Sequence, residues 1–171
     1  MSFKIELKFK TYNLKLILLI AVLVLLLFSI KPFIISGASM EPSYSDGNIV
    51  LVERISHRFG IERGDELLFH NPRGTGEVTL KRVIGLPTET VSIREDTVSI
   101  LYSKEHGYHE ETFGNGTVIG NGENGTAFNM YLGPEDYFVL GDNRVESTDS
   151  RVFGTVQAEH IIGKPILKLK F

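Results

Sequence analysis

Residues 77–86 read EVTLKRVIGL, a run of β-branched and apolar side chains that predicts a β-strand. Similar short runs, each bounded by Gly, Pro, Asn or Asp, occupy residues 48–55, 65–70, 90–93, 97–100 and 137–143. After residue 31 no segment has the long amphipathic period of a helix. We therefore predict a mostly β fold built from antiparallel sheet.

Length and composition narrow the classes of function. The 171 residues leave room for one folded domain of about 140 residues behind an N-terminal segment of different composition. The net charge is -3, and acidic and basic residues are mixed along the chain, which argues against nucleic-acid binding. The absence of cysteine excludes disulfides, a thiolate nucleophile and any zinc site with Cys ligands.

The N-terminal segment has the composition of a membrane anchor. Residues 16–30 read LILLIAVLVLLLFSI, and with Leu14 they would form a helix about 25 Å long, against a hydrocarbon core of roughly 30 Å. Before this run, Glu6 is outnumbered by basic residues, which are Lys4, Lys8, Lys10 and Lys15. Because lysine is enriched on the cytoplasmic side, the N-terminus is predicted to be cytoplasmic.

This pattern predicts a single-pass protein of the cell membrane. Residues 1–13 would be cytoplasmic, residues 14–31 the transmembrane anchor, and residues 32–171 an extracytoplasmic β domain. The alternative is a cleaved signal peptide, whose apolar stretch is usually about 7–15 residues long and ends at a small-x-small site. Lys31-Pro32-Phe33 stands where small residues would be expected, so a retained anchor is favoured.

Residues 103–127 read SKEHGYHEETFGNGTVIGNGENGTA, which is rich in Gly and Asn and predicts a loop-rich insertion at about 103–130. His106 and His109 lie three residues apart, but a solvated loop is favoured over a metal site because the pattern fixes no third ligand. Asn115 and Asn124 begin Asn-Gly-Thr triplets, and their glycosylation is left open.

Three polar segments carry candidate chemistry, although each alone has an ordinary explanation. Ser39 lies in SGASMEP, residues 36–42, which also reads as a surface turn. Lys81 has the apolar neighbour Leu80 and shares a strand face with Thr79 and Val83, yet a solvated strand lysine is common. The segment GDNRVESTDSR, residues 141–151, also reads as a turn with a surface Asp–Arg pair.

Together these segments suggest a serine nucleophile with a lysine base. A serine hydroxyl needs a base within hydrogen-bond reach, and a neutral lysine can serve. To be neutral near pH 7, Lys81 must lose about three pKa units, or about 4 kcal/mol, which burial can supply. Ser39 and Lys81 are therefore the predicted catalytic pair.

The motifs SGASMEP, RGDELLF, LKRVIGLP and YFVLGDNRVESTDSRVFG, in this order behind an anchor, resemble bacterial type I signal peptidase of the single-anchor kind. The resemblance covers residues 31–102 and 131–171. Relatives from the endoplasmic reticulum and from archaea use histidine where Lys81 stands, so the chain resembles the bacterial kind.

The resemblance implies that Ser39 attacks the scissile carbonyl and that Lys81 is the general base, which later protonates the leaving amine. It implies an oxyanion contact from the Ser39 N–H and an orienting hydrogen bond from Ser147 to Lys81. The supporting set also contains Asp142 and an Asp149–Arg151 ion pair that holds the loop. No metal or cofactor is implied.

The implied substrate site consists of Ile35, Gly37, Met40 and Leu80, which would line shallow pockets for small side chains. Some family members carry a serine at the position of Gly37, so here the oxyanion hole would rely on backbone and water. Ile35 and Met40 are further predicted to form an apolar surface that dips into the membrane interface. The usual LPGD motif reads LPTE at residues 86–89, which leaves the geometry of that turn open.

The implied function is removal of signal peptides from exported preproteins after Ala-x-Ala, on the outer face of the membrane. The implied partners are preproteins, the lipid bilayer and, by proximity, the secretion translocon, without nucleic acid. Two alternatives are a catalytically inactive, membrane-tethered β binding domain and a related self-cleaving Ser/Lys protease. The second should carry a DNA-binding module where this chain has its anchor.

Overall fold

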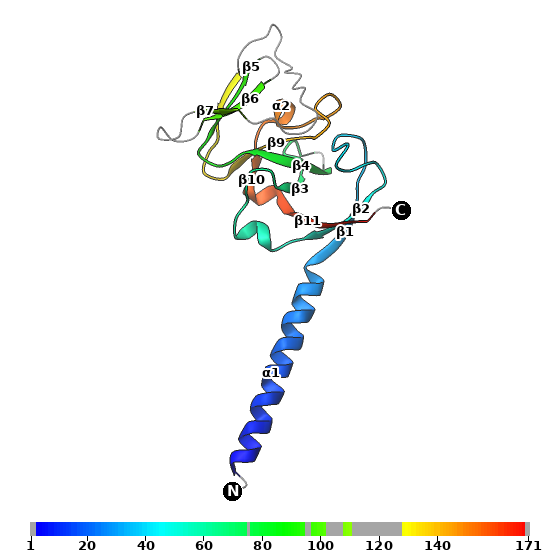
Figure 1. The fold of residues 1–171 in the computed structure, drawn as a ribbon, viewed down its shortest axis with the longest axis vertical. Coiled ribbons are helices and arrows are strands. Elements are labelled where there is room, and N and C mark those ends of the chain that lie inside the picture. The colour runs from blue at the N-terminus through cyan, green and yellow to red at the C-terminus, as the bar shows by residue number, and fades with distance from the viewer. Residues whose placement is uncertain (1–2, 75, 95–96, 102–107, 111–127, 170–171) are drawn as a thin grey trace. The chain divides into compact units, whose positions relative to one another are not determined.

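The computed structural model describes residues 3–74, 76–94, 97–101, 108–110 and 128–169. The chain divides into two compact units, Met1–Lys31 and Pro32–Phe171. The first unit contains the long helix α1 (Phe3–Phe28), drawn in blue in Figure 1. Among the helices that the structure describes, none meets the length and hydropathy of a membrane span.

The strands confirm a mostly β, antiparallel fold. They are β1 (Ile30–Ile34), β2 (Ile49–Glu53), β3 (Glu66–His70), β4 (Val78–Gly85), β5 (Thr90–Arg94), β6 (Thr97–Leu101), β7 (Tyr108–Glu110), β8 (Phe128–Tyr131), β9 (Asp136–Leu140), β10 (Val156–Gln157) and β11 (Ile161–Leu169). Short helices are η1 (Ser56–Arg58), α2 (Ser150–Phe153) and η2 (Ala158–His160).

These strands form two sheets. The larger has seven strands in the order β1-β2-β11-β3-β4-β9-β10, and the smaller has four in the order β7-β6-β5-β8. Figure 1 shows β5, β6 and β7 grouped to one side of β3, β4 and β9. The buried side chains of Ile84, Val91, Leu132 and Phe138 belong to one hydrophobic cluster, so the two sheets share a core.

The strand β4 lies between β3 and β9 in the larger sheet and carries Lys81. Its residues 78–82 pair with β3, from Glu66 opposite Arg82 to His70 opposite Val78. Its pairing with β9 begins only at Arg82. On that side, the described strands leave residues 78–81 unpaired, and three of these residues, Val78, Thr79 and Leu80, line the pocket beside Ser39.

The sequence prediction missed the strand β11, which pairs with both β2 and β3. Pro165 lies within it and cannot donate a backbone hydrogen bond, which disfavours a strand. The pairing with β2 shifts register between Pro165 and Leu167, so an irregularity accommodates the proline.

The predicted insertion at 103–130 is described only in part. Within it the structure describes the strand β7 and the start of β8, both in the smaller sheet. His106 and the Asn-Gly-Thr triplets at Asn115 and Asn124 lie outside the described residues.

Candidate active site

Ser39 lies between β1 and β2, in a connection held by backbone and side-chain hydrogen bonds. The Ile35 N–H donates to the Asn48 carbonyl at 2.8 Å, which ties the start of this connection to the residue before β2. Gly37 has a φ of +86°, a conformation that side chains disfavour, and its N–H donates to Asp46 Oδ1 at 2.7 Å. These contacts fix the backbone that leads into Ser39.

Lys81 lies in β4, opposite Leu67 of β3. The residue is only 2% exposed. Its Nζ lies 2.6 Å from Ser39 Oγ and 3.2 Å from Thr79 Oγ1. Residues two apart in a strand share a face, which explains the contact with Thr79. The structure thus places Ser39 and Lys81 at hydrogen-bonding distance.

Burial lowers the pKa of Lys81 from 10.5 to about 8, because removal from water penalises the charged ammonium. The negative charges of Asp149, Glu77 and Asp142 oppose this change, in that order, without cancelling it. A lysine with a pKa of about 8 carries a substantial neutral fraction in mildly alkaline solution. It can then accept a proton from a neighbouring hydroxyl.

The segment 141–151, which follows β9, lies against the backbone of Ser39. The Asn143 N–H donates to the Ser39 carbonyl at 3.1 Å. A Cβ at Gly141 would collide with that same carbonyl and with Ser147 Oγ. Glycine at position 141 therefore allows the close approach of this segment to Ser39.

Asp149 and Arg151 form a buried ion pair within this segment. Arg151 Nε lies 2.8 Å from Asp149 Oδ1, and the Asp149 side chain is 0% exposed. Asp149 Oδ2 also accepts the Gly141 N–H at 3.0 Å. Because Asp149 caps α2 as well, the pair connects that helix to the glycine beside Ser39.

A pocket of about 210 Å³ opens beside Ser39. It is lined by Phe33, Ile35, Ser36, Ser39, Met40, Glu77, Val78, Thr79 and Leu80. Of the predicted substrate residues, Ile35, Met40 and Leu80 line this pocket, whereas Gly37 is not among its described lining residues.

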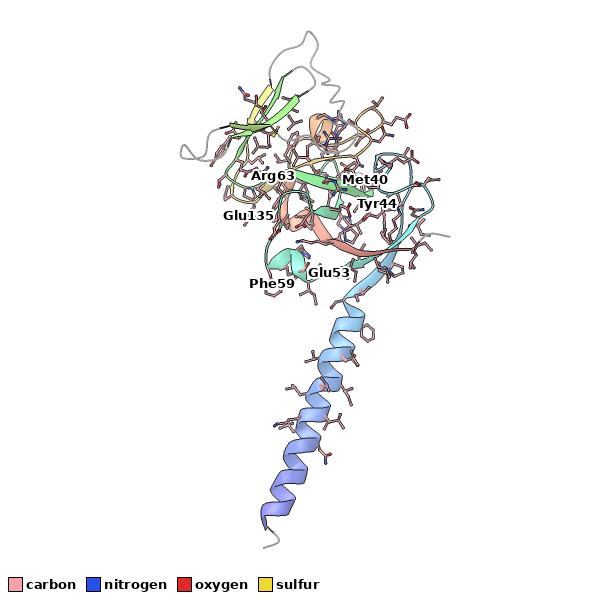
Figure 2. All side chains as sticks on the ribbon, in the orientation of Figure 1. Met40, Tyr44, Glu53, Phe59, Arg63 and Glu135 are labelled. Carbon is pink, nitrogen blue, oxygen red and sulfur yellow. The ribbon has the colours of Figure 1, made fainter. Side chains whose placement is uncertain are left out.

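The prediction that Ile35 and Met40 form a surface in the membrane interface is wrong. Ile35 is 4% exposed and Met40 is 1% exposed. Both belong to a core cluster that also contains Tyr44, and Figure 2 shows Met40 beside Tyr44. Because both side chains are buried in this cluster, they cannot contact lipid. They line the pocket beside Ser39 instead.

Comparisons with known proteins identify the family of this chain. The family described as signal peptidase, peptidase S26, matches residues 9–169. Signal peptidase I V of Bacillus subtilis (strain 168) is 36% identical over 143 residues, which are 75% of this chain and 79% of the relative. The chain belongs to the S26 signal peptidase family.

Further relatives carry similar names. Signal peptidase IB of Staphylococcus aureus (strain Mu50) is 32% identical over 151 residues, which are 80% of this chain and 76% of the relative. A solved signal peptidase I from Enterococcus faecalis V583 has 31% sequence identity and a TM-score of 0.43, over 61% of this chain and 96% of that chain. Membership of the S26 family makes this chain a hydrolase, a serine endopeptidase of the signal peptidase I type.

The hydrogen bond expected in this S26 peptidase from Ser147 to Lys81 is not formed in the described structure. Ser147 Oγ is buried and has no hydrogen-bond partner among the described residues. It lies instead where a Cβ of residue 141 would stand. The supporting role of Ser147 therefore stays a prediction.

Sequence reasoning missed a polar network next to Lys81, which joins Arg82 to Asp142 and Glu66. Arg82 follows Lys81, and its Nε and Nη2 each bind an oxygen of Asp142 at 2.7 Å. Its Nη2 also lies 2.7 Å from Glu66 Oε1. Adjacent residues of a strand point to opposite faces, so Arg82 had to lie on the face opposite Lys81. This alternation was the one signal in the sequence that could have pointed to Arg82.

The described part of the chain contains no cluster of three or more His, Cys, Asp or Glu residues suited to a metal ion. His109 belongs to β7, and His106, three residues before it in the chain, lies outside the described residues.

Proposed function

We propose that this S26 peptidase is a membrane-anchored enzyme that removes signal peptides from exported preproteins, with Ser39 as nucleophile and Lys81 as general base. The observation that carries the proposal is the 2.6 Å distance between Ser39 Oγ and the Nζ of the buried Lys81. That distance lies within the reach required of a nucleophile and its base.

The reaction follows from this pair. Neutral Lys81 accepts the Ser39 hydroxyl proton while Oγ bonds to the scissile carbonyl carbon. The resulting lysine ammonium gives that proton to the leaving amine as the peptide C–N bond breaks, which leaves an acyl group on Ser39. Lys81 then takes a proton from water and the hydroxide attacks the acyl carbon. The ester bond between this carbon and Ser39 Oγ breaks, which releases the new carboxyl terminus, and the proton on Lys81 returns to Oγ. The Ser39 N–H is proposed to donate to the oxyanion.

Residues of the segment 141–151 are proposed to support this pair. Asp149 and Arg151 hold the segment against Ser39, and Asp142 fixes Arg82 next to the base. Ser147 is proposed to orient Lys81 when substrate is bound. Its hydroxyl is buried and has no partner within the described part of the chain, which supports this role because buried polar groups normally find a partner.

The pocket is proposed to select small substrate side chains. An extended substrate can add to the unpaired edge of β4 at residues 78–81, and its alternate side chains then face the same way. Ile35, Met40 and Leu80 are packed in the core and form a fixed part of the wall of this pocket, whose volume is about 210 Å³. This supports cleavage after Ala-x-Ala, with small residues at the first and third positions before the cut.

The membrane part of the proposal rests on the sequence. We propose that residues 1–13 are cytoplasmic, that 14–31 anchor the chain and that 32–171 form the extracytoplasmic catalytic domain. The apolar run at 16–30 and the lysines before it support this orientation. Substrates would then arrive at the outer face, near the secretion translocon.

The test is cleavage of a model preprotein by the detergent-solubilised full chain, with the cut mapped by mass. Ser39→Ala and Lys81→Ala should each lower activity by at least about 10³-fold while remaining folded. Lys81→Arg should be equally inactive, because a guanidinium does not release its proton at working pH. Near-normal turnover by any of these variants would disprove the assigned pair.

A further inference from the structure

The Glu66 carboxylate connects the two segments that carry Ser39 and Lys81. Glu66 begins β3 and stands opposite Arg82 of β4, and side chains opposite each other on antiparallel strands come into contact. Glu66 Oε1 accepts a hydrogen bond from Arg82 Nη2 at 2.7 Å, while Oε2 accepts one from the Tyr44 hydroxyl. Its two oxygens thus bind two different segments.

Tyr44 fixes the turn that contains Ser39. The Tyr44 N–H donates to the carbonyl of Met40, the residue after Ser39, at 2.8 Å. The ring of Tyr44 lies in the core cluster with Met40 and Leu80. Lys168 Nζ lies 5.1 Å from the ring centroid and donates to the Ser43 carbonyl, so the C-terminal strand also holds this turn.

Arg82 fixes the strand that contains Lys81. Its Nη1 donates to the Gly64 carbonyl at 2.8 Å, and its Nε and Nη2 bind both oxygens of Asp142. Asp142 precedes Asn143, whose N–H donates to the Ser39 carbonyl. The guanidinium therefore connects the base strand to the backbone of the nucleophile from the other side.

These contacts close a ring around the Ser39–Lys81 pair. Starting at the Ser39 carbonyl, the ring passes through Asn143, Asp142, Arg82, Glu66, Tyr44 and Met40, and returns to Ser39. Glu66 has no chain neighbour in the ring, and both of its links, to Arg82 and to Tyr44, are side-chain contacts. Loss of Glu66 would open the ring between the turn and the strand.

We infer that Glu66 is a positioning residue that holds Ser39 Oγ within reach of Lys81 Nζ by acting through Tyr44 and Arg82. The inference rests on the proposed function, because it assumes that these two groups react together. Proton transfer requires hydrogen-bonding distance, and displacements of about 1 Å can cost about 10²-fold in rate. Glu66 does not line the substrate pocket, so its loss should affect turnover more than substrate binding.

The test compares variants of the detergent-solubilised full chain on a model preprotein, well below their unfolding temperatures. Tyr44→Phe keeps the buried ring and removes only the hydroxyl link to Glu66, so kcat should fall about tenfold with KM within about twofold. The midpoint of the pH profile of kcat/KM should stay in place, because no charge changes. Glu66→Ala should lose more activity than Glu66→Gln, whose amide oxygen still accepts a hydrogen bond.

The double variant Tyr44→Phe/Glu66→Ala should be no slower than Glu66→Ala, because both changes break the same link. Asp65→Asn is the matched control: Asp65 precedes Glu66 and pairs with Lys164 at 2.6 Å, and both side chains are partly buried as in the Glu66–Arg82 pair. Asp65→Asn should lower the unfolding temperature and leave kcat unchanged.

Several outcomes would overturn the inference. Folded Tyr44→Phe and Glu66→Ala variants with the parent kcat would do so, and so would losses that multiply in the double variant. An equal loss of kcat in Asp65→Asn would also do so, because it would show that loss of any ion pair in this region lowers kcat through stability alone. Ser39→Ala separates the two hypotheses. If it retains activity, the proposed function fails, whereas an inactive Ser39→Ala beside unaffected Glu66 variants rejects only the positioning role.

Discussion

Lys81 determines the pH range in which the proposed catalytic pair can work. Burial lowers its pKa to about 8, and only the neutral amine can accept the Ser39 proton. We therefore expect kcat/KM to rise from pH 6 and to level off above the lowered pKa. The measurement is kcat/KM between pH 6 and pH 10, with circular dichroism at each pH to verify folding. A kcat/KM that still rises steeply up to pH 10, as it would for a lysine with the ordinary pKa of 10.5, would contradict the role of burial.

The same burial should cost stability at neutral pH. Folded Lys81 has the lower pKa, so the unfolded chain binds more protons between pH 8 and 10.5, and stability rises with pH across that window. Below the window the full cost is present, about 3 kcal/mol for a pKa lowered from 10.5 to about 8. Lys81→Met removes the charge and keeps most of the volume.

We therefore expect Lys81→Met to be more stable than the parent at pH 7, and its advantage to shrink by about 3 kcal/mol toward pH 10.5. Urea unfolding of both proteins at pH 7 and pH 10.5 measures the two differences in unfolding free energy. Lys168→Met, at the partly exposed lysine near Tyr44, is the control for loss of a lysine. An identical Lys81→Met difference at both pH values would show that Lys81 is not desolvated as the structure indicates.

Among the elements, the turn between β4 and β5 carries a residue of the wrong type for its backbone. Pro87 and Thr88 are its central residues, and the Glu89 N–H donates to the Leu86 carbonyl at 3.3 Å. Thr88 has a φ of 68°, a left-handed conformation in which glycine is favoured over a β-branched residue. This is the turn whose geometry the LPTE motif left open.

Thr88→Gly should stabilise the protein by about 1 kcal/mol, because relief of the strain exceeds the entropy that glycine adds to the unfolded chain. The Thr88 side chain is exposed, so no packing is lost. The expected rise in unfolding temperature is about 2–4 °C by thermal denaturation. Thr88→Ala keeps a Cβ in the same conformation and serves as the control, with a smaller gain. A lower unfolding temperature for Thr88→Gly would contradict the argument.

The elements also show what local sequence can and cannot predict. The strands β2, β3 and β4 were predictable because each is a short β-branched run between turn residues. The strand β11 was not, because Pro165 conflicts with strand pairing and only the register shift resolves that conflict. Ser39 and Lys81 stood out through their chemistry and their resemblance to the family motifs.

The Glu66 network could not be predicted in the same way. Its contacts depend on which residue stands opposite which across two strands, and a single sequence does not fix that register. In the sequence, Glu66 reads as an ordinary polar residue at the start of a strand and Tyr44 as an ordinary aromatic residue after a turn, so neither stands out. Their relation to Arg82 appears only when the strands are paired.

At the scale of the whole molecule, the proposed site depends on segments far apart in the chain. Ser39 comes from the connection before β2, Lys81 from β4 and Asp149 from the segment after β9. Their contacts all lie within the unit Pro32–Phe171. The function proposed for that unit further requires that it face the outer side of the membrane, where exported preproteins arrive.

The orientation of the chain can be tested with single cysteines, since the sequence contains none of its own. Lysines before the apolar run predict that residue 2 is cytoplasmic, whereas Glu159, an exposed residue of η2, should lie outside. In intact bacterial cells, a membrane-impermeant maleimide should label Glu159→Cys and should label Ser2→Cys only after permeabilisation. Label on Ser2→Cys in intact cells, with Glu159→Cys protected, would reverse the proposed topology. If the Ser2→Cys protein takes no label even after permeabilisation and runs as a shorter band, the apolar segment is a cleaved leader and not a retained anchor, because residue 2 is removed with the leader.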